Sequence, residues 1–172
     1  MAEGPEILLV TRRFRVVRQV STSPSGKTHV HETVQHPGAV TILPMVDRVC
    51  LIRNYRPSVK RTLIELPAGT LEPGEEPVTT ARRELAEETG YRAGSIKRLA
   101  EFFMSPGILS ERMHLFLATD LKGGSVELDA SEEIETFVVT WADAVRMALD
   151  GSIEDAKTLA GILLYDRVRR LG

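Results

Sequence analysis

The segment from Gly69 to Tyr91 constrains the fold most, because it joins a turn-rich loop to a helix with an acidic side. Between Pro77 and Thr89, apolar residues recur at steps of three and four, the spacing of a helix with one buried face. Pro77 suits the first turn of such a helix, and Gly90 suits the position just past its end. We therefore predict a helix over residues 77–89 that turns its apolar side into a core.

Strand patterns flank this helix on both sides. They cover residues 7–34, 39–45, 49–55, 96–104, 113–118 and 134–140. Helical patterns return at 141–149 and 153–171. Two helical layers around a mixed sheet predict an α/β (α+β) fold of the sandwich type, preceded by an N-terminal antiparallel strand segment.

The composition limits the partners of the protein. The chain has 172 residues, with 22 Lys and Arg against 24 Asp and Glu, a formal net charge of −2. This length suits one compact unit, and the near balance of charge argues against nucleic acid or an anionic membrane as a partner. We expect a small-molecule substrate.

Two further absences in the sequence point to a cytoplasmic protein. Cys50 is the only cysteine, which excludes an intramolecular disulfide and a Cys-rich zinc site. No run of about 18 apolar residues is long enough for a membrane span, and the first residues lack the apolar core of a signal peptide. We expect a soluble, cytoplasmic protein.

The acidic side of the predicted helix is a candidate metal site. Glu84, Glu87 and Glu88 lie three and four residues apart, so their carboxylates can approach one face of the helix. Hard divalent ions prefer carboxylate and carbonyl oxygens. A solvated acidic surface is the alternative. The loop with Gly69 and Gly74 directly before the helix favours the metal site.

The fixed residues of this segment resemble the Nudix hydrolase motif at every defining position but one. The matching positions are Gly69, Glu75, Arg83, Glu84, Leu85, Glu87, Glu88 and Gly90. Tyr91 replaces the usual aliphatic residue, and its ring can fill the same pocket. The resemblance implies an α/β/α sandwich that hydrolyses a nucleoside diphosphate linked to another group.

The resemblance also assigns roles to the acidic residues. It implies that Glu84, Glu87 and Glu88 bind a divalent metal, Mg²⁺ or Mn²⁺, and that Arg83 braces these carboxylates through ion pairs. Glu75 would support the cluster from the loop. Arg83 and Glu87 thereby become candidate catalytic residues.

Two other stretches resemble the ADP-ribose pyrophosphatase branch of the family. Residues 53–56 and 65–69 lie before the helix, and residues 105–112 follow it, with Pro106 placed 16 residues after Gly90 as in that branch. The implied reaction converts ADP-ribose to AMP and ribose 5-phosphate. The alternatives are hydrolysis of another nucleotide sugar, such as GDP-mannose or ADP-glucose, and a non-catalytic ADP-ribose sensor.

This branch implies further site residues. The carbonyl of Ala68 would join the metal ligands, Arg56 would contact the diphosphate, and Glu111 would bind near the ribose hydroxyls. Arg53 and Pro106 complete the predicted substrate site. Arg56 could instead be a surface charge, and Glu111 could pair with Arg112 or cap a turn.

A catalytic base is expected in the acidic run before the last predicted strand. Glu132 and Glu133 are the candidates, because a loop there could close on the substrate. A solvated loop is the alternative, and bound metals could also generate enough hydroxide without a base.

The N-terminal strands predict association. Residues 1–38 form a segment that can bury little by itself, and residues 39–172 form the hydrolase domain. In the ADP-ribose branch such a segment packs across a two-fold axis. We expect a homodimer.

Overall fold

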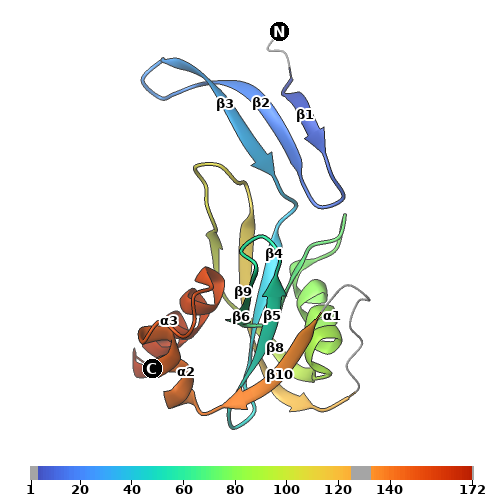
Figure 1. The fold of residues 1–172 in the computed structure, drawn as a ribbon, viewed down its shortest axis with the longest axis vertical. Helices are drawn as coiled ribbons and strands as arrows, with labels where there is room; N and C mark the ends of the chain where they lie inside the picture. The colour runs from blue at the N-terminus through green and yellow to red at the C-terminus, as the bar shows by residue number, and fades with distance from the viewer. Residues whose placement is uncertain (1–3, 125–132, 172) are drawn as a thin grey trace.

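The computed structural model describes residues 4–124 and 133–171, and Figure 1 shows their strands and helices. In chain order they are β1 (Glu6–Val10), β2 (Arg15–Thr22), β3 (Thr28–Gln35), β4 (Ala39–Pro44), β5 (Val49–Arg56), β6 (Arg61–Glu65), β7 (Ala68–Thr70), α1 (Pro77–Thr89), β8 (Arg92–Phe103), β9 (Arg112–Lys122), β10 (Ile134–Val139), α2 (Trp141–Leu149) and α3 (Ala156–Leu171). The predicted α+β class is confirmed.

The described strands form three sheets. Their orders are β1-β2-β3, β10-β5-β6 and β7-β4-β9-β8. The pairs are antiparallel except β4 and β9, which run parallel. The second and third sheets make up the body of the molecule, whereas the first extends away from it (Figure 1).

Helices cover the body on two sides, with α1 on one side and α2 and α3 on the other (Figure 1). Successive residues of a strand point to opposite faces, so β4 contributes to two cores. Ile42 packs with Ala81 and Leu85 of α1. Leu43 packs instead with Leu115 and Ile162, in the core next to α2 and α3. The result is the predicted α/β/α sandwich.

Helix α1 has the predicted bounds, and local signals set both of its ends. Pro77 occupies the first turn, where a missing N–H removes no helical hydrogen bond. Gly90 ends the helix with a φ of 71°, in the left-handed region, and its N–H donates to the Ala86 carbonyl at 2.9 Å. The loop before Pro77 and the chain after Gly90 are therefore held in fixed directions.

Helix α3 begins at Ala156 rather than at Ile153 as predicted. The Asp155 carboxylate accepts a hydrogen bond from the Thr158 N–H at 3.0 Å, which caps the helix there. Ile153 is 2% exposed and belongs to the core instead. The prediction failed because Ile153 fits a helical spacing while serving a core outside the helix.

Hydrogen bonds connect the end of the N-terminal sheet to the body. The Val34 N–H donates to the Ile108 carbonyl at 2.8 Å, and the Ser110 N–H donates to the Val34 carbonyl at 2.9 Å. The His36 N–H donates to the Ser110 hydroxyl at 2.9 Å. These bonds tie the end of β3 to the loop between β8 and β9. Within the described residues, none of the helices has both the length and the apolar character to cross a bilayer.

Candidate active site

Arg83 forms ion pairs with three carboxylates at the predicted metal site. Its Nε and Nη2 lie 3.3 and 3.2 Å from the two oxygens of Glu75. Its Nη1 donates to Glu84 Oε1 at 2.7 Å and to Glu87 Oε2 at 2.9 Å. Partial burial opposes the charged guanidinium, but the bonds from Glu75 and Glu84 outweigh it and raise the pKa of Arg83. The bond from Arg83 lowers the pKa of Glu75.

The backbone of β7 lies directly against the other acidic residues. Glu88 is 3% exposed, and its Oε2 accepts a hydrogen bond from the Ala68 N–H at 2.9 Å. A Cβ added to Gly69 would lie 1.9 Å from Cδ and Oε1 of Glu84. Only a residue without a side chain leaves room for the Glu84 carboxylate here, so Gly69 is required for this close approach.

The residues around Arg83 fit a hard divalent cation. Glu84 and Glu87 already converge on one positively charged nitrogen, and the donors available are all oxygens, as Mg²⁺ and Mn²⁺ prefer. Among the described residues, no three His, Cys, Asp or Glu side chains meet closely enough to enclose an ion by themselves.

A second charged network surrounds Glu65, which is fully buried. Arg56 donates hydrogen bonds to both oxygens of this carboxylate, from Nε to Oε1 at 2.7 Å and from Nη2 to Oε2 at 2.6 Å. Lys157 Nζ donates to the same Oε2 at 2.5 Å and to Asp155 Oδ1 at 2.9 Å. Burial opposes ionisation of Glu65, but the bonds from Arg56 and the charge of Lys157 lower its pKa below the ordinary value.

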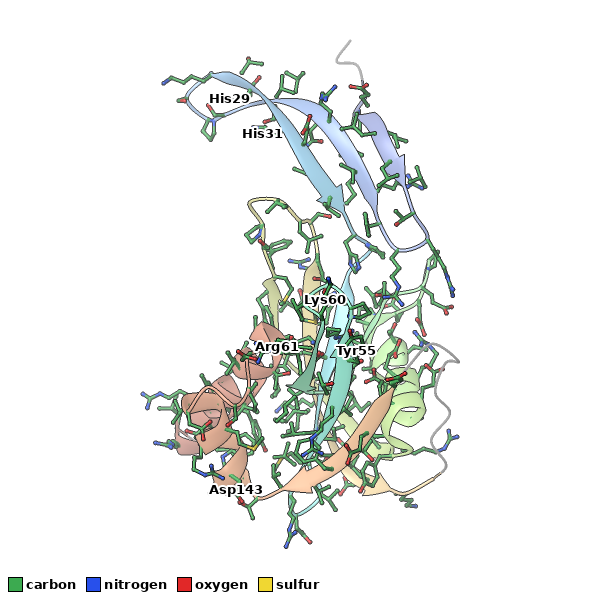
Figure 2. The ribbon with its side chains drawn as sticks, in the orientation of Figure 1. His29, His31, Tyr55, Lys60, Arg61 and Asp143 are labelled. Atoms are coloured by element: carbon green, nitrogen blue, oxygen red, sulfur yellow. The ribbon has the colours of Figure 1, made fainter. Side chains whose placement is uncertain are left out.

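A cavity of about 420 Å³ lies beside the network of Glu65 and the backbone of β7, and the predicted metal ligands Glu84, Glu87 and Glu88 are not among the residues that line it. It is lined from the N-terminal sheet, the body strands, the loop between β8 and β9, and α3; the lining includes Arg13, Phe14, Arg56, Ala68, Glu111 and Lys157. The turn from β5 to β6, which ends at Lys60 as labelled in Figure 2, contributes Ser58 and Val59 to the lining. Three predicted site residues, Arg56, Ala68 and Glu111, therefore share one cavity.

Glu111 pairs with a residue other than Arg112, which was the partner in the alternative to substrate binding. Its Oε1 lies 3.6 Å from Nδ1 of His36, a residue at the junction of the N-terminal sheet and the body. Arg112 instead approaches Glu101 at 3.5 Å, and its guanidinium lies 5.5 Å from the centre of the Phe103 ring. The alternative in which Glu111 pairs with Arg112 is therefore wrong, and Glu111 remains directed to the cavity that it lines.

Two predicted substrate residues are not among those that line this cavity. Arg53 Nη1 lies 3.4 Å from Glu135, and its guanidinium covers the Phe137 ring at 4.1 Å, so both of its partners are on β10. Pro106 is exposed on the loop between β8 and β9. Their roles in binding stay predictions.

The candidate bases come directly before β10 in the sequence. Glu132 lies outside the described residues. Glu133 is exposed and directly precedes β10, whose first residue, Ile134, pairs with Asn54. Asn54 is two residues from Arg56, so the register brings Glu133 toward the end of β5 that supplies Arg56.

The sequence analysis assigned no role in the site to several residues that line the cavity, including His36, Glu65, Asp155 and Lys157. The sequence does carry one local signal, since Asp155 followed three residues later by Thr158 is a helix-start pattern. The pairing of Glu65 with Lys157 joins residues 92 positions apart and has no local signal.

Known proteins resemble this chain over most of its length. A NUDIX domain matches residues 34–161. The ADP-ribose pyrophosphatase of Bacillus subtilis is 42% identical over 143 residues, which is 81% of this chain and 77% of that protein. A methanol dehydrogenase activator of Bacillus methanolicus is 36% identical over the same shares of each chain. A GDP-mannose pyrophosphatase of Escherichia coli is 35% identical over 76% of this chain and 74% of its own length.

A solved structure described as an ADP compounds hydrolase has the same overall fold. It superposes with a TM-score of 0.81 at 26% sequence identity, and the match covers 99% of this chain and 96% of the other. The match therefore includes the N-terminal sheet as well as the body.

Proposed function

This chain belongs to the Nudix hydrolase family, and on that basis we propose that it hydrolyses the diphosphate of ADP-ribose to AMP and ribose 5-phosphate. The observation that carries the proposal is the shared cavity, in which Arg56 and Glu111 lie with the backbone at Ala68 that contacts the acidic helix. Two of the similar proteins reported above are named for ADP-ribose or ADP compounds.

Arg56 is suited to binding the diphosphate. A guanidinium presents five N–H donors in a rigid fork that matches phosphate oxygens. Glu65 engages Nε and Nη2, which orients the group and leaves Nη1 for a ligand in the cavity. Glu111 supplies a carboxylate, the natural acceptor for the hydroxyls of a ribose.

The acidic helix is suited to hydrolysis that depends on a divalent metal. The oxygens that would hold Mg²⁺ or Mn²⁺ are those of Glu84, Glu87, Glu88 and the Ala68 carbonyl. Such an ion, when bound, supplies Lewis acidity and lowers the pKa of a coordinated water. Arg83 keeps Glu84 and Glu87 side by side through its ion pairs, so the site is oriented before substrate arrives.

The proposed catalytic base is a carboxylate from the segment before β10. Glu132 or Glu133 would accept the proton of the attacking water at a carboxylate oxygen. Support comes from the pairing of β10 with β5, which places Glu133 near the strand that carries Arg56. Arg53 and Pro106 do not line the cavity, so their proposed contacts are with parts of the substrate that reach beyond it.

We further propose a cytoplasmic homodimer in which residues 1–38 associate and residues 39–172 form the hydrolase domain. Apolar side chains on the N-terminal sheet support this proposal: Ile7, Leu9, Val20 and Val30 are 54%, 51%, 69% and 63% exposed. Leu9, Val20 and Val30 share one face of the sheet, because Leu9 pairs with Val16 and Val20 pairs with Val30, whereas Ile7 pairs with Val17 on the other face. Exposed apolar groups that share a face mark an interaction surface.

Another nucleotide sugar is the second candidate substrate, because a GDP-mannose pyrophosphatase is also similar to this chain. A panel of ADP-ribose, ADP-glucose and GDP-mannose with Mg²⁺ separates the candidates through kcat/KM. ADP-ribose is expected to be the best substrate. GDP-mannose turned over as fast or faster would overturn the assignment. A sensor without activity is disfavoured because the acidic residues and Arg83 are all present.

Replacement of Glu87 by Gln tests the hydrolytic role of the helix. Because Glu87 offers a carboxylate to the metal position, kcat is expected to fall by about 10²-fold or more, the usual effect of removing a main electrostatic group. Glu76→Gln is the matched control, since Glu76 is exposed at the start of the same helix and makes no side-chain cap. Full activity of Glu87→Gln would refute the proposed role.

A further inference from the structure

We propose that Lys157 and Glu65 are positioning residues for the reaction: they hold the guanidinium of Arg56 in the orientation that binds the substrate diphosphate. The inference rests on the proposed function of Arg56. It extends that function to α3, a helix that carries none of the residues of the Nudix motif.

The geometry shows that Lys157 and Arg56 are coupled through one carboxylate. Both nitrogens bond the same oxygen, Oε2 of Glu65, at 2.5 and 2.6 Å. Glu65 is fully buried, and the side chain of Lys157 is 9% exposed. A displacement of the Glu65 carboxylate therefore moves Arg56, because two parallel hydrogen bonds fix the guanidinium to it.

Lys157 is itself anchored to the body. Asp155 accepts from Lys157 Nζ through Oδ1 at 2.9 Å and from the Thr158 N–H through Oδ2 at 3.0 Å. The Thr158 hydroxyl accepts from the Leu66 N–H at 2.8 Å, next to Glu65 in the chain. The first turn of α3 thus contacts the end of β6 at two adjacent residues and sets the place of the Glu65 carboxylate.

Close packing keeps α3 in this register. A Cβ added to Gly161 would lie 2.7 Å from Leu66 Cδ1 and 3.3 Å from Leu115 Cδ1. The helix backbone therefore lies directly on the segment that leads from Glu65 to Ala68. The same segment donates the Ala68 N–H to Glu88, so one short stretch of chain links the two charged networks.

The charges of the network also require Lys157. Arg56 and Lys157 carry two positive charges against the two negative charges of Glu65 and Asp155, so the four groups sum to zero. Without Lys157 the sum is −1. That excess negative charge draws Arg56 more strongly toward the protein carboxylates, so the loss of Lys157 reaches the substrate through Arg56.

A double-mutant cycle tests the proposal with ADP-ribose as substrate. Lys157→Met removes the ammonium and keeps an apolar stem, and Arg56→Met removes the positioned group. If Lys157 acts through Arg56, we expect Lys157→Met to lower kcat/KM about tenfold or more in the parent chain, but less than about twofold when Arg56 is already Met. KM is expected to account for much of the loss, since Arg56 binds before the reaction.

Equal losses in both backgrounds would overturn the proposal, because they would show that Lys157 acts independently of Arg56. An unchanged kcat/KM in Lys157→Met would also overturn it. Lys157→Arg, which can still reach Glu65, is expected to recover part of the activity. Lys97→Met is the matched control, since Lys97 is an exposed residue of β8, and it is expected to match the parent.

If Lys157→Met does not fold, a second variant tests the same proposal. Asp155→Asn can still cap α3 but loses the charge that holds Lys157. In a cycle with Arg56→Met, it is also expected to lower kcat/KM strongly in the parent chain and only slightly when Arg56 is already Met. Parent protein that binds ADP-ribose without cleaving it would refute the proposed function alone. The cycle would then be measured on the Kd for ADP-ribose, with the same two outcomes.

Discussion

Arg83 makes the acidic side of α1 a site rather than a solvated surface. Solvated carboxylates should be largely exposed, yet the side chain of Glu84 is 12% exposed and Glu88 is 3% exposed. Glu87, at 39%, is the most open of the three, and Arg83 bonds it as well. Like charges placed this closely repel, so the arrangement needs a cation, and Arg83 supplies one that stays charged at any physiological pH.

A methyl group at Gly69 should damage this site without unfolding the chain. In Gly69→Ala the new Cβ would meet the Glu84 carboxylate at 1.9 Å, and Glu84 can move because it is the far end of a flexible side chain. We expect the Mg²⁺ concentration for half-maximal activity to rise about tenfold or more, because Glu84, a proposed metal ligand, would be displaced. The melting temperature should change little.

Gly123→Ala is the control for this substitution. A Cβ at Gly123 would have no atom within 4 Å, so both metal dependence and melting temperature should match the parent. Normal metal dependence in Gly69→Ala would show that the Glu84 carboxylate does not need the close approach of β7.

Among the elements, those with local signals could be predicted and those made by distant contacts could not. Pro77 and Gly90 mark the ends of α1, and Thr140 caps α2 through the Asp143 N–H, so both helices have the predicted bounds. Strands β6 and β7 were missed. They have 5 and 3 residues, too few to show a period, and pairing with β5 and β4 defines them.

The site divides in the same way. The acidic residues and Arg83 lie within one short motif. The hydrogen bond that Lys157 donates to Glu65 depends instead on how α3 packs against β6. Arg53 and Arg56 are three positions apart on β5, so a strand period of two sends them to opposite faces. Applied to the sequence, this period already separates Arg56 in the cavity from Arg53 on the side of Phe137.

The contact between β6 and α3 should lose strength in acid. The pKa of Glu65 in the folded chain lies below its ordinary value of 4.5, despite burial, because of Arg56 and Lys157. A lowered folded pKa stabilises the folded state above the unfolded pKa, and that contribution disappears as pH falls through the folded value. The free energy of unfolding in urea should therefore decline from pH 5 downward.

Comparison with Lys157→Met shows how much of the fall in the free energy of unfolding below pH 5 is due to Glu65. Without the ammonium, the folded pKa of Glu65 moves up toward the ordinary value, so the variant should lose less stability between pH 5 and acid than the parent does. Lys97→Met should follow the parent curve. Parallel curves for parent and Lys157→Met would show that this ion pair does not contribute to acid sensitivity.

At the scale of the whole molecule, one end of the N-terminal sheet lies at the cavity and the other end lies far from it. Its turn between β1 and β2 supplies Arg13 and Phe14 to the cavity lining. Its far end, where His29 and His31 are labelled in Figure 2, projects away from the body. A small sheet that extends away from the body is marginal by itself, so burial by a second copy would stabilise both the sheet and the residues that it brings to the cavity.

Association through this sheet predicts a mass of twice 19.1 kDa at micromolar concentration, measured by light scattering after size exclusion. Val20 and Val30 are directly opposite in the pairing of β2 with β3 and are both exposed, so a carboxylate there would be buried in the dimer without a partner. Val30→Asp is therefore expected to elute as a folded monomer. His31→Asp places the same charge on the neighbouring residue, which faces the other side of the strand, and should remain dimeric. A parent chain that is monomeric, or a Val30→Asp variant that stays dimeric, would contradict association through this face.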